Sequence, residues 1–121
     1  MTSKTQIVAH RGYRSVAPEN TLPAFEAALA YQPDMLEMDV HRTKDGHLVV
    51  IHDEKVDRTT NGTGYVKDLT LAELKLLDAG SYKEPKMPGV RIPTFDEFLS
   101  FLQRVDFSDT LLLEIKTDHI D

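Results

Sequence analysis

Residues 35–41 read Met-Leu-Glu-Met-Asp-Val-His, and this stretch decides the fold class. Apolar and polar residues alternate along it, as in a β-strand with two unlike faces, which carry Leu36, Met38 and Val40 on one side and Glu37, Asp39 and His41 on the other. The turn signal Asp45-Gly46 and the apolar residues 48–51 then predict a hairpin whose return strand ends at His52-Asp53.

Apolar segments on either side of this hairpin predict two more strands. Residues 7–11 are typical of a buried strand that breaks at Gly12, and residues 110–116 form a third strand. Amphipathic helices separate the strands. Asn20 or Thr21 caps the first helix, whose apolar face consists of Leu22, Phe25 and Leu29. A capping box of Thr94 and Glu97 begins the second helix, whose apolar face consists of Phe95, Phe98, Leu99 and Leu102. This order predicts a parallel α/β fold.

Residues 54–93 interrupt the alternation. They are rich in Gly, Thr, Lys and Pro, and their one amphipathic stretch begins with a capping box of Thr70 and Glu73 and carries Leu71, Leu74 and Leu77 on one stripe. We therefore predict a single unit of residues 1–121 in which residues 54–93 form an inserted excursion from the main fold.

The composition is that of one ordinary globular domain, with 121 residues, 40% of them hydrophobic, and no cysteine. Without cysteine there is neither a disulfide framework nor a thiolate metal site, so a reducing, cytoplasmic setting is expected. Neither a secretory signal nor an integral membrane segment is expected. The formal charge is −6 with scattered Lys and Arg, which argues against a nucleic-acid partner.

Polar residues gather at the ends of the predicted strands, where the first carries His10 and Arg11, the second Glu37 and Asp39, and the third Glu114 and Lys116. The carboxyl ends of parallel strands surround a common mouth, so these side chains are expected to meet there. The alternative interpretation is that they are charges on edge strands and face water.

Three carboxylates in one mouth, those of Glu37, Asp39 and Glu114, would repel one another unless a cation neutralised them. Oxygen ligands without thiolate suit Mg²⁺ or Ca²⁺, and salt bridges to Arg11 or Lys116 are the alternative. Arg11 and Lys116 also have the charge and the donors to hold the oxygens of a phosphate group.

Two histidines, His10 and His52, lie at strand ends beside the predicted cation site. Imidazole exchanges protons near neutral pH, so we predict that this pair acts as acid and base. No role is expected for the remaining histidines, His41, His47 and His119. The residues alone therefore predict a site for a small phosphate ester.

A series of short segments, in order along nearly the whole chain, resembles the glycerophosphodiester phosphodiesterase family. The segments are Ala9-His10-Arg11-Gly12, Pro18-Glu19-Asn20-Thr21, Glu37-Met38-Asp39-Val40, Asp45-Gly46, Ile51-His52-Asp53, Asp57-Arg58-Thr59-Thr60-Asn61-Gly62-Thr63-Gly64, Ile92-Pro93-Thr94 and Leu113-Glu114-Ile115-Lys116. The resemblance implies a TIM-barrel (β/α)₈ fold, of which this chain supplies the N-terminal portion: about three strands and two helices, with the family's small insertion after the second strand.

The resemblance also implies an activity and a role for each site residue. The activity is hydrolysis of glycerophosphodiesters, such as glycerophosphocholine or glycerophosphoethanolamine, to glycerol 3-phosphate and an alcohol with the help of a divalent cation. The roles that it implies are metal binding by Glu37, Asp39 and Glu114, general base and acid catalysis by His10 and His52, and phosphate contact by Arg11 and Lys116.

The length of the chain departs from the family's pattern, because a closed barrel of this kind needs about 250 residues. We expect the chain to be the amino-terminal part of a longer enzyme. The alternatives are a truncation that self-associates or takes a partner, and an inactive phosphate-binding fragment. Related barrel phosphodiesterases that act on lysolipids or phosphoinositides are the alternative enzymes. The sequence leaves open whether water or the glycerol 2-hydroxyl attacks phosphorus first.

Overall fold

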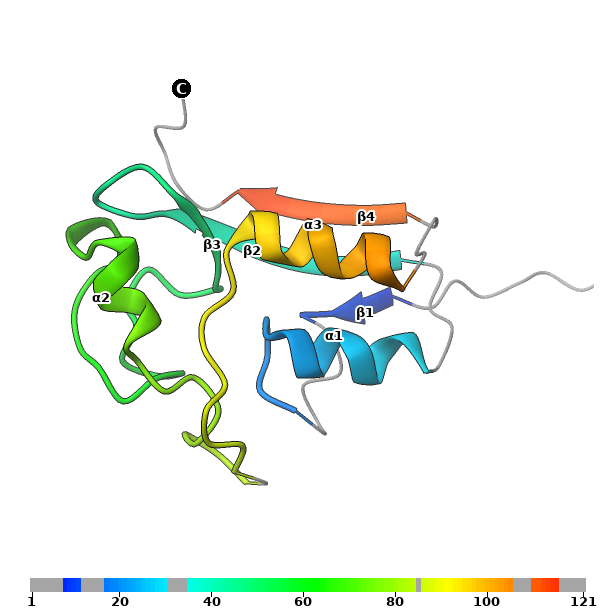
Figure 1. Ribbon diagram of the computed structural model, residues 1–121, viewed down its shortest axis with the longest axis horizontal. Coiled ribbons are helices and arrows are strands. Elements are labelled where there is room, and N and C mark those ends of the chain that lie inside the picture. Colours follow the sequence, from blue (N-terminus) through cyan, green and yellow to red (C-terminus); the bar gives the residue numbers. More distant parts are fainter. Residues whose placement is uncertain (1–7, 12–16, 31–34, 85, 106–109, 116–121) are drawn as a thin grey trace, which may run out of the picture.

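A computed structural model describes residues 8–11, 17–30, 35–84, 86–105 and 110–115, of which residues 8–10, 35 and 110–115 are described by their backbone alone. Its elements, drawn in Figure 1, are β1 (Val8–His10), α1 (Leu22–Leu29), β2 (Met35–Arg42), β3 (Leu48–Val50), the 3-10 helix η1 (Val66–Asp68), α2 (Leu71–Lys75), α3 (Phe95–Arg104) and β4 (Thr110–Ile115). The predicted order of strands and helices is confirmed.

Strand β2 is the centre of the sheet. β1 and β4 run parallel to it on opposite edges, and β3 pairs antiparallel with its last residues, Val40 lying opposite Val50. The predicted hairpin is thus present, and Gly46 supplies the φ of +87° that its turn uses. The three parallel strands present their carboxyl ends at the same edge of the sheet, as the sequence predicts.

Helices α1 and α3 cover the same face of the sheet (Figure 1). Phe25 of α1 and Phe98 of α3 meet edge to face with ring centroids 4.7 Å apart, and both are fully buried. They pack against the apolar face of β2 in one cluster, which we call the main core and which contains Phe25, Ala28, Leu36, Met38, Val40, Val50, Phe98, Phe101 and Leu102. Burial of each large side chain contributes about 1.5–3 kcal/mol, so this face holds the sheet and helices together.

The helix starts follow the predicted caps. Thr70 and Thr94 each accept a hydrogen bond from the backbone N–H three residues on, and the glutamate at that position bonds back, which completes both capping boxes. Thr21 occupies the N-cap of α1, but its hydroxyl donates to the Pro18 carbonyl rather than accepting from the helix. The short loop from Pro18 is therefore tied to the helix that follows it.

A second cluster of buried side chains lies under the excursion. It consists of Val49, Ile51, Val56, Val66, Leu74, Ala79 and Ile92, with Leu71 and Leu77 packed against it. The predicted stripe of Leu71, Leu74 and Leu77 thus packs on one core, although α2 ends at Lys75 and Leu77 lies beyond it. Because Val50 belongs to the main core while Val49 and Ile51 belong to this excursion core, β3 is shared by both.

One residue of the predicted apolar faces lies elsewhere. Leu99 is 38% exposed, whereas Phe101, which the sequence pattern left out, is buried in the main core. The reason is geometric, since the buried stripe of α3 is centred on Phe98, with Phe101 about 60° to one side and Leu102 about 40° to the other, whereas Leu99 projects about 100° away from Phe98. None of the helices among the described residues combines the length and hydropathy that a bilayer crossing requires.

Candidate functional site

The polar face of β2 is buried. Glu37 is 4% exposed and Asp39 is 0% exposed, and Arg11 and Asn20 lie against them. The interpretation of these residues as edge charges that face water is therefore wrong for β2. Burial, together with the neighbouring charge of Asp39, raises the pKa of Glu37 to about 7. Two neighbouring buried carboxylates on one face of a strand favour the binding of a cation.

Strand register places two further predicted residues at the level of these carboxylates. His10 of β1 pairs with Glu37, and Glu114 of β4 pairs with Asp39. The backbone positions are thus adjacent, while the side chains of His10 and Glu114 lie outside the described residues, as does the whole of Lys116. The roles of these three residues stay predictions.

Arg11 reaches the buried carboxylates from the end of β1. Its backbone N–H donates to the Glu37 carbonyl at 2.9 Å and to Glu37 Oε1 at 3.2 Å. Its Nε lies 3.5 Å from Asp39 Oδ2, and its Nη1 donates to Glu19 Oε2 at 3.3 Å. Arg11 also has a φ of +57°, which costs energy in a residue that carries a Cβ. Strain of this kind is characteristic of functional sites.

Asn20 supports Asp39 from the loop before α1. Its Nδ2 donates to Asp39 Oδ2 at 3.0 Å, and the backbone N–H of Asp39 donates to Asn20 Oδ1 at 3.4 Å. Asn20 has a φ of +55°, and its backbone N–H donates to the Arg11 carbonyl at 2.9 Å. Two residues in the left-handed region therefore bond to each other and hold the loop against β2.

The remaining oxygen of Asp39 fits a cation site. Asp39 Oδ1 is buried and has no hydrogen-bond partner among the described residues, and Arg11 Nε is in the same situation. A buried acceptor left in this state costs about 1–3 kcal/mol, and a hard divalent cation would satisfy a carboxylate oxygen. The described side chains alone bring together no group of three metal-binding carboxylates or imidazoles, and the side chain of the third predicted ligand, Glu114, is not among them.

His52 follows β3 and is held at both its ring and its backbone. Its Nδ1 lies 2.8 Å from Asp53 Oδ1, and its carbonyl accepts a hydrogen bond from His41 Nε2 at 2.8 Å. His41, for which no role was expected, is buried on the polar face of β2 and holds the backbone at His52. The imidazole of His52 itself stays 29% exposed, so a ligand can reach it.

Arg58 joins two carboxylates that are far apart in the sequence. Its Nη1 and Nη2 donate to Glu19 Oε1 and Oε2, both at 2.9 Å. Its Nε and Nη2 donate to Asp53 Oδ2 and Oδ1 at 2.9 Å and 3.0 Å. These bonds from Arg58 lower the pKa of Asp53 to about 2. Burial alone would raise the pKa of Glu19, but Arg58 lowers it below its usual value.

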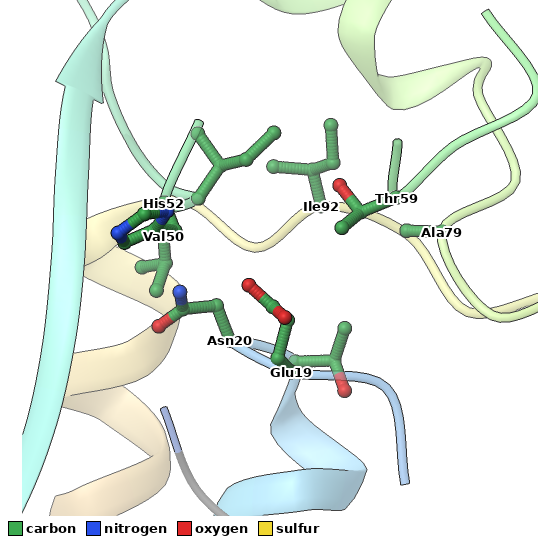
Figure 2. A pocket seen from close by; sticks show the side chains of 9 residues that line it. Glu19, Asn20, Val50, His52, Thr59, Ala79 and Ile92 are labelled. Carbon is green, nitrogen blue, oxygen red and sulfur yellow. The ribbon is translucent and has the colours of Figure 1, made fainter. Parts of the chain in front are cut away.

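A small hollow lies beside these groups, and Figure 2 shows its walls. Glu19 and Asn20 line it from the loop before α1. Val50 lines it from β3, and His52 lies two residues after that strand. Thr59, Ala79 and Ile92 line it from the excursion. A wider and more open hollow also borders His52 and is lined by His41, His52, Asp53, Glu54, Lys55 and Tyr65. His52 therefore borders both hollows.

Four of the residues just described were not predicted as site residues, namely Glu19, Asn20, Asp53 and Arg58. Each lies in a segment that carries the family resemblance, which was the only signal for them. Periodicity gives no hint of the bonds between Arg58 and Glu19, because the two residues are 39 positions apart and neither lies in a regular element.

Known proteins match this chain over most of its length. A model of the glycerophosphoryl diester phosphodiesterase family matches residues 10–121. A glycerophosphodiester phosphodiesterase of Caldanaerobacter subterraneus subsp. tengcongensis is 53% identical over 114 residues, which cover 94% of this chain and 46% of the relative.

Solved structures agree with this match. The crystal structure of a glycerophosphodiester phosphodiesterase from Agrobacterium tumefaciens aligns with a TM-score of 0.84 and 41% identity over 93% of this chain and 47% of its own. An Oleispira antarctica phosphodiesterase in complex with the product sn-glycerol-3-phosphate aligns with a TM-score of 0.85 and 39% identity over 93% of this chain and 45% of its own. This chain spans less than half the length of these relatives, and it belongs to the glycerophosphoryl diester phosphodiesterase family.

Proposed function

We propose that this chain carries the catalytic residues of an enzyme that hydrolyses glycerophosphodiesters to glycerol 3-phosphate and an alcohol. The observation that carries the proposal is the buried pair of Glu37 and Asp39 in the middle of β2. The backbone N–H of Arg11 bonds to Glu37, and its Nε lies 3.5 Å from Asp39 Oδ2. The relatives named as glycerophosphodiester phosphodiesterases, and the one bound to sn-glycerol-3-phosphate, support the same substrate class.

A divalent cation, Mg²⁺ or Ca²⁺, is part of this proposal, with Glu37, Asp39 and Glu114 as its protein ligands. The unsatisfied Oδ1 of Asp39 and the raised pKa of Glu37 both fit a site that needs positive charge. When bound, the cation would neutralise charge that develops on the phosphoryl oxygens. The guanidinium of Arg11 would bind the same phosphate group, and Lys116 is the second cation proposed for that task.

The proton transfers are assigned to His10 and His52. One imidazole removes a proton from the attacking hydroxyl as its oxygen bonds to phosphorus, and the other donates a proton to the alcohol oxygen as its bond to phosphorus breaks. The attacking hydroxyl is either that of water or the 2-hydroxyl of glycerol. In the second route a cyclic phosphate forms first, and water then opens it with the two imidazoles in exchanged roles.

The excursion of residues 54–93 has a proposed place in this enzyme. We assign it to the small insertion of the family, since Ala79 and Ile92 of its core line the same hollow as His52, and its Arg58 bonds to Asp53, the residue after that histidine. In this position the excursion forms one wall of the site, so it is expected to influence which alcohol leaves.

The first test is an assay for glycerol 3-phosphate with the protein at the full length that its gene encodes. Glycerophosphocholine, glycerophosphoethanolamine, micellar lysolipids and phosphoinositides form the substrate panel. We expect release of glycerol 3-phosphate from the water-soluble diesters, loss of activity after exhaustive chelation, and recovery with Mg²⁺ or Ca²⁺. His52→Ala should reduce kcat by about 10²–10⁴-fold.

His47→Ala is the matched control, because His47 is 55% exposed and lies 3.9 Å from Asp45 in the hairpin turn. Its activity should equal that of the parent protein. Full turnover after chelation would remove the cation from the proposal. Cleavage of lysolipids or phosphoinositides alone would identify one of the alternative enzymes, and phosphate binding without hydrolysis would identify a non-catalytic module.

A further inference from the structure

We propose that Asp53 and Arg58 are positioning residues that present the Nε2 atom of His52, and not its Nδ1 atom, for proton exchange with substrate. The inference rests on the proposed function, in which His52 transfers a proton, and adds how the chain prepares that histidine. The residues concerned, Glu19, Arg58, Asp53 and His52, form a continuous chain of hydrogen bonds that we call the arginine network.

The contact between His52 and Asp53 decides which ring nitrogen carries the proton. Asp53 is ionised at neutral pH, because the hydrogen bonds of Arg58 lower its pKa to about 2, and an ionised carboxylate can only accept hydrogen bonds. At 2.8 Å from Asp53 Oδ1, His52 Nδ1 must therefore be the donor. Nε2 is then the atom left to give or take a proton.

Arg58 holds Asp53 in the orientation that this contact needs. Its Nε and Nη2 bond to the two oxygens of Asp53, and the adjoining edge of the same guanidinium, Nη1 and Nη2, bonds to the two oxygens of Glu19. Because the guanidinium is rigid, four bonds in one plane leave the Asp53 carboxylate little freedom to rotate.

Glu19 extends the arginine network to Arg11, the residue proposed to bind the phosphate group. Its Oε2 accepts hydrogen bonds from Arg58 Nη2 and from Arg11 Nη1, at 2.9 Å and 3.3 Å. Its backbone N–H donates to Tyr82 Oη at 3.2 Å, and its side chain is 7% exposed. One buried carboxylate thus orients the arginine beside His52 and the arginine proposed to bind phosphate.

The charges around His52 make the role testable. Those that face it are Asp53, Arg58 and Glu19 in the network, His41 on β2, and Glu54 and Lys55 in the wider hollow. Removing the negative charge of Asp53 makes a protonated His52 less favourable, whereas removing the positive charge of Arg58 leaves two carboxylates uncompensated and makes it more favourable. The two changes should therefore act in opposite directions on pH dependence.

The first experiment reads the histidine directly and needs no turnover. Imidazole ¹⁵N NMR on the full-length protein should find His52 with its proton on Nδ1 in the neutral form. The asparagine of Asp53→Asn has one acceptor oxygen and one NH₂ group in place of two acceptor oxygens. Its NH₂ group must therefore face either His52 Nδ1 or Arg58 Nε. We expect a mixture of His52 tautomers in this variant, and a parent-like spectrum in Arg91→Met, the control for loss of an exposed arginine.

The second experiment measures kcat and KM against pH. Asp53→Asn should lower kcat about 10-fold or more with little change in KM, and should shift one limb of the pH profile toward lower pH. Arg58→Met should shift the same limb toward higher pH. Arg58→Lys keeps the charge without the fork, so it should lower kcat and leave the limb in place.

The outcomes separate this inference from the proposed function. A parent protein that releases no glycerol 3-phosphate overturns the proposed function and with it the assigned task of His52. An active parent whose variants keep the His52 tautomer and show unshifted profiles overturns the positioning role alone. Thermal unfolding measurements identify any variant that loses the fold. If one does, the pH profile of Arg58→Lys and the NMR spectrum of Asp53→Asn decide whether the positioning role holds.

Discussion

At the residue scale, the site is built from charged groups that burial would disfavour if they stood alone. Glu37, Asp39 and Glu19 are all nearly inaccessible to solvent, and each is in contact with, or close to, the donors of an arginine or an asparagine. Such groups are costly to bury unless paired. Their presence around Arg11 is therefore better explained by the binding of a charged ligand than by stability.

The lowered pKa of Asp53 predicts how stability depends on acid. Asp53 has a pKa of about 2 in the folded protein against 3.8 ordinarily, so its ionised form stabilises the fold above about pH 4, and this stabilisation is lost as the pH falls toward about 2. Asp53→Asn should therefore reduce the fall in Tm between pH 4 and pH 2.5, as measured by circular dichroism.

The control for this measurement is Asp68→Asn on η1, where the side chain is exposed. That variant should keep the parent's slope. An Asp53→Asn protein with the same acid sensitivity as the parent would show that the ion pair with Arg58 contributes no differential stability. Glu19, whose pKa is also lowered, should account for part of the slope that remains.

At this scale the sequence predicted the residues whose positions follow from alternation along a strand. Glu37 and Asp39 were predicted to share one face, and both lie on the buried polar face of β2. The prediction that they end the strand is wrong, because β2 runs on to Arg42 and pairs there with β3. Glu19, Asp53 and Arg58 escaped prediction because their contacts join two irregular loops, and no local pattern encodes a bond across 39 residues. The left-handed backbone of Arg11 is likewise invisible in composition or periodicity.

At the element scale, local signals were reliable where they act within one turn of helix. Both capping boxes form between residues that are three positions apart, so the sequence alone contains the whole interaction. The face of α3 was less predictable, because the sheet decides which stripe is buried. Phe101 rather than Leu99 joins the main core for that reason.

The assignment of this face predicts a contrast between two neighbouring positions on α3. Phe98→Ala should destabilise the protein by about 3–5 kcal/mol, since Phe98 is fully buried against Phe25 and the apolar face of β2. Leu99→Ala should change stability by about 0.5 kcal/mol or less, because Leu99 is 38% exposed. Urea unfolding of both variants measures the difference, and equal losses would show that the face is wrongly assigned.

At the scale of the whole molecule, the chain supplies consecutive parallel strands of the family's TIM barrel. β1, β2 and β4 lie side by side in chain order with α1 and α3 on one face, and the polar face of β2 looks the other way. The alignment to under half of each solved relative agrees with a partial barrel. Strand order predicted a parallel α/β fold, whereas the partial TIM barrel was predicted from the family resemblance together with the length of the chain.

This arrangement predicts the behaviour of residues 1–121 expressed alone. Among the described residues β4 pairs with β2 and with no other strand, and its sequence is Thr-Leu-Leu-Leu-Glu-Ile. Apolar parallel strands with an open edge tend to pair with other chains. Light scattering after size exclusion should therefore detect self-association. The activity assay should detect little or no release of glycerol 3-phosphate. A stable 13.7 kDa monomer with full turnover would contradict this expectation.

The sharing of β3 between two cores has a consequence for how His52 can change over evolution. The N–H of Val50 donates to the Pro93 carbonyl and that of Ile51 to the Asp39 carbonyl, both at 2.9 Å, so the residues before the histidine are tied to both cores at once. Insertions or deletions within the excursion must preserve this anchor while the loops beyond it vary. Changes in the excursion can therefore alter the residues around the site only if the bonds of Val50 and Ile51 are kept, and His52 is the next residue after these two.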